Sequence, residues 1–86
     1  MIFDFFSYFL LATALNSPMP KYDCWDIGTF VEVAEQTTDE DRRNRQWKAW
    51  LYLAPNKRKK GLVLKAMAAH KAGITSDQIY RECETI

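Results

Sequence analysis

Helix stop and start signals recur at short intervals along this chain, and they constrain its fold more than any other feature. Pro20 and Pro55 cannot continue a helix, and Gly73 is a typical left-handed helix end. Thr75 and Gln78 then have the spacing of a capping box, which starts a new helix. The segments between these signals are short. The sequence therefore predicts an all-α fold, a small bundle of about four to five short helices.

The length and composition favour one ordered domain, residues 1–86. The chain is 48% hydrophobic and 14% aromatic, which is typical of a protein with a packed core. At this size folding hides only roughly 60 to 65% of the surface that the unfolded chain exposes. We therefore expect a compact binding module, without room for a multi-part enzyme cleft.

Residues 2–15 are apolar almost throughout. As a helix they would be about 20 Å long, whereas a bilayer core needs roughly 30 Å. A secretory signal would begin with Lys or Arg, and the only early charge is Asp4, although Ala12–Ala14 matches a small-residue cleavage pattern. We expect a core or interface helix and no membrane span, with a signal or anchor as the lesser alternative. Phe3 and Phe6 are its candidate interface residues.

The middle of the chain predicts two helices. Residues 25–36 fit a helical period, and the strand alternative has no second strand to pair with. In the segment that follows, Thr37 and Glu40 have capping-box spacing. Trp47 and Trp50 then lie on one apolar stripe. We expect both to pack in the core, and an exposed binding hot spot is the alternative.

The stretch from Lys65 to Cys83 predicts a C-terminal helical hairpin that resembles a helix-turn-helix. Leu62, Leu64, Met67 and Ala68 are expected on the inner side of its first helix, with the methylene stem of Lys71 as a further candidate. The second helix is acidic, which disfavours its entry into a DNA groove lined by phosphates. The hairpin is therefore expected more as a structural unit than as a DNA reader.

Charge is distributed very unevenly. Residues 1–41 carry eight acids against Lys21 alone, for a net charge of −7. Residues 42–76 carry ten Lys or Arg and no acid, and residues 77–86 have a net charge of −2. Such a division indicates how a protein meets its partners more than how it folds.

The cations supply the candidate sites for a partner or for nucleic acid. Those at the start of the helix expected after Asn56 are unfavourable for the helix dipole, so local helix stability does not explain them. Contact with phosphates or an acidic protein, and a solvated linker, are about equally supported. The candidate residues are Arg42, Arg43, Arg45, Lys57, Arg58, Lys59 and Lys60.

Residues that carry catalysis or bind metals are sparse. His70 is the only histidine, and no nucleotide-binding, nucleophile or metalloprotease motif occurs. Cys24 and Cys83 are too far apart for a redox or metal motif and suggest reduced thiols in the cytoplasm, with a single bridge as the alternative. We expect a cytoplasmic, non-enzymatic protein that needs no cofactor or metal.

Two functional classes follow. The first is a small helical adaptor or inhibitor that binds a larger protein or protein complex, using Phe3, Phe6, Trp47 or Trp50 for contact area and the split charges for orientation. The second is a helix-turn-helix type regulator that binds nucleic acid through the basic region. The acidic final helix favours the first. The size and charge pattern also resemble those of many small proteins encoded by phages and mobile elements.

Overall fold

The structure, a computed structural model, describes residues 19–86. Residues 1–18, which include the apolar segment 2–15 with Phe3 and Phe6, lie outside the described part. Residues 19–86 form helices and connecting turns, with no strand among them, and this confirms the all-α prediction. The helices are α2 (Lys21–Gln36), α3 (Glu40–Leu53), α4 (Lys57–Lys71) and α5 (Ser76–Cys83).

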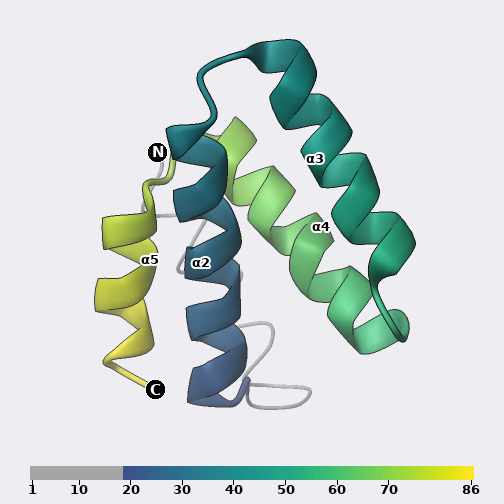
Figure 1. Cartoon of the computed structure of the whole chain (residues 1–86). Coiled ribbons are helices and arrows are strands. Elements are labelled where there is room, and N and C mark those ends of the chain that lie inside the picture. The colour runs from purple at the N-terminus through teal and green to yellow at the C-terminus, as the bar shows by residue number, and fades with distance from the viewer. Residues whose placement is uncertain (1–18) are drawn as a thin grey trace.

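Helix α2 organises the packing of the other helices. The short α5 packs along one side of α2, α4 packs against another side, and α3 packs on α4 (Figure 1). The main packing partner of both α4 and α5 is thus α2. Within residues 19–86, no helix has both the length and the apolar composition needed to cross a membrane.

The helix ends mostly follow the local signals. Asn56 caps α4, because its side-chain oxygen accepts a hydrogen bond from the Lys59 N–H at 2.9 Å. Gly73, with φ of 83°, closes α4 in the left-handed conformation that suits glycine. The Ile74 N–H then bonds the Ala69 carbonyl at 2.9 Å. The predicted capping box of Thr75 is present at the start of α5.

The predicted capping box at Thr37 is wrong. Helix α3 is capped by Asp39, whose carboxylate accepts hydrogen bonds from the N–H groups of Asp41 and Arg42 at 2.9 and 3.4 Å. Thr37 instead closes the preceding helix, since its hydroxyl donates to the Val33 carbonyl at 3.0 Å. Asp and Thr are both good caps, and the residue nearer the helix takes the position.

The core lies between α2 and the helices packed on it. The inner face of α4 matches the predicted one only in part: Leu62 is buried and Met67 packs partly buried against the core, whereas Leu64 is 50% exposed and Ala68 is also exposed. The face is rotated because α4 must bury residues against α2 and α3 at once. The buried apolar residues are Met19, Cys24, Ile27, Val31, Ala34, Trp47, Leu62, Val63, Ala66, Ala69, Ile74, Ile79 and Cys83.

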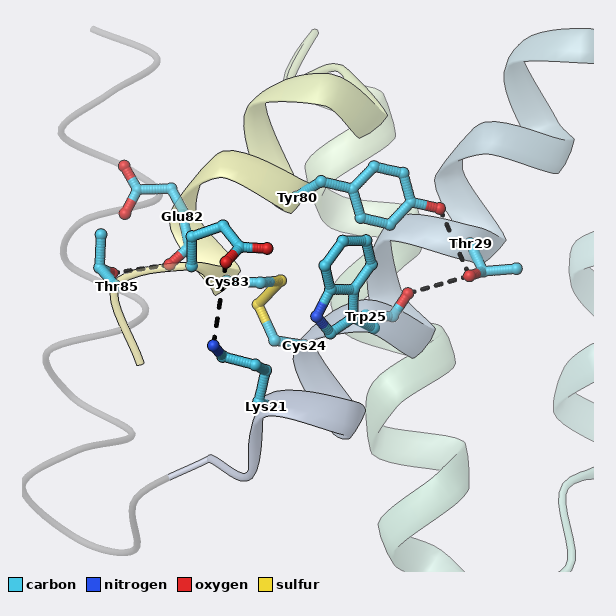
Figure 2. Close-up of a disulfide and its surroundings, with 9 residues drawn as sticks. Lys21, Cys24, Trp25, Thr29, Tyr80, Glu82, Cys83 and Thr85 are labelled. Carbon is cyan, nitrogen blue, oxygen red and sulfur yellow. Dashed lines mark hydrogen bonds and ion pairs between the residues drawn. A yellow bond between two sulfur atoms is a disulfide. The ribbon is translucent and has the colours of Figure 1, made fainter.

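Cys24 and Cys83 form a disulfide that joins α2 to the end of α5 (Figure 2). The two residues are only 1% and 0% exposed, and 59 positions separate them in the sequence. The expectation of reduced thiols is therefore wrong, because folding brings together two cysteines whose spacing resembles no motif. The pairing also removes the argument from which we predicted a cytoplasmic location, since disulfides persist in oxidising compartments.

Tyr80 of α5 fits against α2 at a glycine. Its ring lies 4.6 Å from the Trp25 ring, centroid to centroid (Figure 2). Its hydroxyl donates a hydrogen bond to a Glu32 carboxylate oxygen at 2.7 Å. Burial, together with the neighbouring charge of Glu32, raises the pKa of Tyr80. A Cβ atom on Gly28 would lie 2.8 Å from Tyr80 Cδ1, so only glycine leaves room for the ring.

Candidate binding surface

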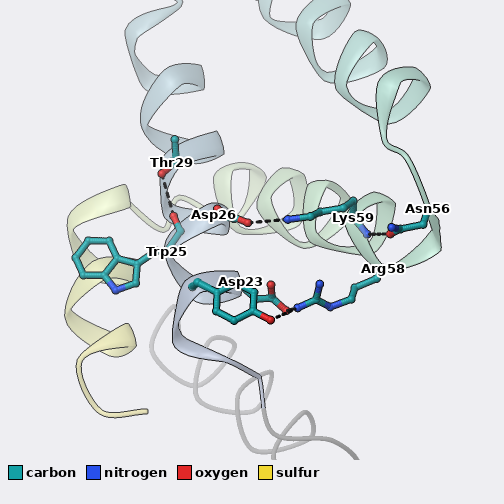
Figure 3. A network of polar contacts seen from close by, with 8 residues as sticks. Asp23, Trp25, Asp26, Thr29, Asn56, Arg58 and Lys59 are labelled. Carbon is teal, nitrogen blue, oxygen red and sulfur yellow. Dashed lines mark hydrogen bonds and ion pairs between the residues drawn. The ribbon is translucent and has the colours of Figure 1, made fainter.

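Two residues of the basic run hold the start of α4 to α2. Arg58 Nη2 lies 2.6 Å from Asp23 Oδ2 and 3.1 Å from the Tyr22 hydroxyl, and Lys59 Nζ lies 3.1 Å from an Asp26 oxygen (Figure 3). The hydrogen bond with Tyr22 and the charge of Asp23 raise the pKa of Arg58. The structure therefore explains half of the cations that the helix dipole disfavours: their partners are acids on another helix.

Asp23 makes the Arg58 pair structurally important. It is only 4% exposed, and among residues 19–86 no group hydrogen-bonds its second oxygen, Oδ1. An unpaired carboxylate at such a position would be costly, so Arg58 supplies the charge that Asp23 requires. Arg58 is thus less available for an external partner than its place in the basic run indicates.

The remaining predicted cations do not gather at one place. Arg43 is partly buried, and its guanidinium donates to the Thr37 carbonyl at 3.0 Å. Arg42 is exposed near the start of α3 and Arg45 about one turn further along it, whereas Lys57 and Lys60 lie at the start of α4. Because α3 and α4 run in opposite directions, their starts lie at opposite ends of the pair (Figure 1), about 20 Å apart along a helix of this length. Arg45 lies between these ends, about 12 Å along α3 from Leu53.

Both tryptophan candidates belong to the packed interior. Trp47 is 5% exposed, and its ring meets Trp50 edge-on at 5.1 Å. Trp50 is half-buried and packs on Phe30 at 5.0 Å. This is the core role that we expected of them, and it leaves Trp47 with little surface to offer a partner.

Sequence reasoning missed two exposed apolar residues at the end of α3. Tyr52 is 88% exposed and Leu53 is 71% exposed, the highest values among the large hydrophobic residues of the described chain. A helix turns about 100° per residue, so Tyr52 points roughly 140° or more away from both Trp47 and Trp50, whereas Leu53 points about 60° from Trp50 and about 120° from Trp47. The exposure of Tyr52 could therefore be read from the helical period, and that of Leu53 could not.

Tyr52 and Leu53 are the last two residues of α3, which ends beside the start of α4 (Figure 1). Exposed cations precede them on α3 and follow them on α4. Arg45, Lys48 and Tyr52 are spaced at i, i+3 and i+7, which places them in one row along α3. We call Arg45, Lys48, Tyr52, Leu53, Lys57 and Lys60 the α3–α4 corner. All six residues are exposed.

The four cations of the corner have no partner in the described part of the chain. Within residues 19–86, their side chains make no ion pair or hydrogen bond. No acid occurs anywhere between residues 42 and 76. Among the described residues, the corner therefore combines an exposed apolar pair with four exposed, unpaired cations.

The opposite side of the molecule is acidic. Helices α2 and α5, which pack together, have net charges of −3 and −1, whereas α3 and α4 have net charges of +2 and +6. Some of the acid is structural: Glu35 of α2 accepts hydrogen bonds from the Ser76 N–H at 2.9 Å and from its hydroxyl at 2.7 Å. Glu35 thereby binds the first turn of α5.

The single histidine and the two cysteines make structural contacts in the fold. His70 packs against Trp47, with ring centroids 6.1 Å apart, and burial lowers its pKa. Both cysteines are in the disulfide. In the described part of the chain, no three His, Cys, Asp or Glu side chains come together as a metal site.

Comparisons of the chain with protein-family models, with curated proteins and with solved structures find no match.

Proposed function

We propose that the protein is a small non-enzymatic adaptor or inhibitor that binds a larger protein through the α3–α4 corner. The observation that carries this proposal is the exposure of Tyr52 and Leu53 at consecutive positions. Neither residue contributes to the core. Adjacent exposed apolar residues mark interaction sites more than scattered ones do, and tyrosine is enriched among the residues that dominate binding energy.

The surrounding structure supports the proposal. The corner is built on the ends of two packed helices, where side chains are held more firmly than on a loop. A buried disulfide cross-links the domain, so the chain needs little further ordering when a partner binds, and the free-energy cost of that ordering is small.

Site-specific photo-crosslinking tests this function. A photoreactive residue at position 53 should capture a partner protein, and the same residue at Asp77 on α5 should not, because α5 lies on the far side of α2 (Figure 1). Capture at position 53 should be lost in the variant Tyr52→Ser. The proposal is wrong if positions 53 and 77 capture the same proteins in equal amounts.

A matched pair of variants separates binding from stability. Leu53→Ser should abolish capture by a photoreactive residue placed at position 52, whereas Leu64→Ser, which also removes an exposed leucine, should leave it unchanged. The free energy of unfolding of both variants should lie within about 0.5 kcal/mol of that of the parent, since neither side chain is in the core.

The second candidate function is nucleic-acid binding by a helix-turn-helix type regulator. The four exposed cations of the α3–α4 corner, which have no acidic partner among residues 19–86, favour it. The acidic α5, which would be the recognition helix, weighs against it because phosphates would repel Asp77 and Glu82. Specific duplex binding that weakens steeply with salt and is lost when Lys57 and Lys60 are neutralised would put this function first.

A further inference from the structure

We propose that the partner segment bound by the α3–α4 corner is an acidic amphipathic helix, with carboxylates on both sides of a central apolar side chain. This inference rests on the proposed function and names the chemistry of the partner.

The order of charged and apolar residues along the corner indicates which residue types the partner segment carries. Arg45 and Lys48 precede the apolar pair along α3, and Lys57 and Lys60 follow it at the start of α4. The apolar pair is therefore preceded by cations on α3 and followed by cations on α4. A complementary segment has an apolar residue at its centre and acidic residues on either side of it.

The charge of the corner is available to a partner. Arg58 and Lys59, in the same basic run, are neutralised by Asp23 and Asp26, whereas Lys57 and Lys60 have no such acid in residues 19–86. The fold thus separates cations that hold α4 in place from cations that face solvent. Exposed charges of the second kind guide association and contribute modestly to affinity.

The apolar pair favours a protein over nucleic acid. Contact with a phosphate backbone is made by cations and small polar groups. Such contact would not bury the side chain of Leu53, which is 71% exposed. An amphipathic helix covers such a residue with its own apolar face and extends its polar edges towards the flanking cations. The combination at the corner therefore fits an acidic helix better than DNA or RNA.

Binding of designed peptides to the full chain tests this inference. The probe is a short amphipathic peptide helix with a row of Leu flanked by rows of Glu, and the control peptide has Lys in place of each Glu. In amide NMR spectra, the Glu peptide should shift signals around residues 45–60 and its affinity should fall with added salt. The Lys peptide should not bind.

Variants locate the electrostatic contribution. The double variant Lys57→Gln/Lys60→Gln should weaken binding of the Glu peptide roughly three- to tenfold, the effect expected for two exposed charges. The control Arg42→Gln/Lys71→Gln removes the same charge from the other end of the α3–α4 pair and should change the affinity less than about twofold.

Several outcomes would overturn the inference. These are equal binding of the two peptides, signal shifts that map to α5, tighter binding of a DNA duplex than of the Glu peptide, or self-association through the corner. If position 53 still captures a partner while the Glu peptide fails to bind, the adaptor function stands and only the acidic-helix partner is wrong. If position 53 captures nothing but the peptide binds as described, the adaptor function is wrong, while the affinity of the corner for an acidic helix stands.

Discussion

Two glycines in helices have opposite roles at the level of single residues. A Cβ on Gly28 of α2 would press into the Tyr80 ring, whereas a Cβ on Gly61 of α4 would have no atom within 4 Å. Glycine in a helix is costly in both places, but only at Gly28 does packing require it. The two positions therefore form a matched pair for substitution.

We predict that Gly28→Ala and Gly61→Ala change stability in opposite directions. Gly28→Ala should lower the free energy of unfolding by about 1 to 2 kcal/mol, the cost of overpacking less the helix propensity gained. Gly61→Ala should raise it by about 0.5 to 1 kcal/mol. Denaturant unfolding measures both values. Stabilisation by Gly28→Ala would show that Tyr80 is not held against α2.

His70 makes stability depend on pH. Burial is the main cause that lowers its pKa in the fold, the charge of Arg43 adds to this, and Glu35 acts in the opposite direction. The unfolded chain therefore binds the proton more tightly, with a pKa near the ordinary value of about 6.5. The stabilising contribution of neutral His70 is complete above that pH and is lost as pH falls below it.

The test is the pH dependence of unfolding in the parent and in His70→Gln. Between about pH 7 and pH 5, stability of the parent should fall more steeply than stability of the variant, by at most about 1.4 kcal/mol per pH unit. Parallel curves for the two proteins would mean that His70 titrates alike in the folded and unfolded states.

At the level of helices, α5 is too short to be stable alone. It has eight residues, and isolated helices below about 12 to 15 residues are marginal in water. Its position depends on Ile79 in the core, on Glu35 at its first turn and on the disulfide at its end. The attachments at its two ends are both to α2.

We predict that removing the disulfide weakens the whole domain. For a closed loop spanning 59 positions, the loss in the double variant Cys24→Ala/Cys83→Ala should be about 4 kcal/mol. Denaturant unfolding of the parent with and without a reductant, beside the variant, provides the measurement. A variant as stable as the oxidised parent would show that packing alone holds α5 on α2.

Local signals made the helices predictable from the sequence. Asn56, Gly73 and Thr75 act on backbone groups within a few residues of themselves, so their roles can be read without a fold. Thr37 misled because Asp39 competes for the same cap. The predicted helix over residues 25–36 is present, and it begins earlier, at Lys21.

Contacts between helices could not be read in the same way. The pairs Arg58–Asp23 and Cys24–Cys83 join residues 35 and 59 positions apart, and nothing in their local sequence identifies the partner. The corner was missed for a different reason: we considered the apolar face of α3 and not the residues that its periodicity leaves outside. Lys57 and Lys60 of the corner were identified as candidates from the sequence. The sequence did not show which cations of the basic run would be neutralised by acids of α2.

At the level of the whole molecule, the described chain has two oppositely charged halves. Asp23 and Asp26 of α2 meet Arg58 and Lys59 of α4 at the boundary between them. The acidic half of α2 and α5 is the part closed by the disulfide, and the basic half of α3 and α4 carries the exposed corner. The acidic half is therefore covalently cross-linked, and the basic half carries the proposed contact surface.

The burial of the disulfide also sets an order of events during biosynthesis. Thiol exchange needs a thiolate and physical access to sulfur, and the folded domain shields both sulfur atoms from solvent. We therefore expect the oxidant to reach the two cysteines before α5 closes over α2. Once closed, the bond is equally hidden from cellular reductants. The oxidation state of this protein is consequently fixed by the surroundings in which it folds, and it persists if the protein later moves elsewhere.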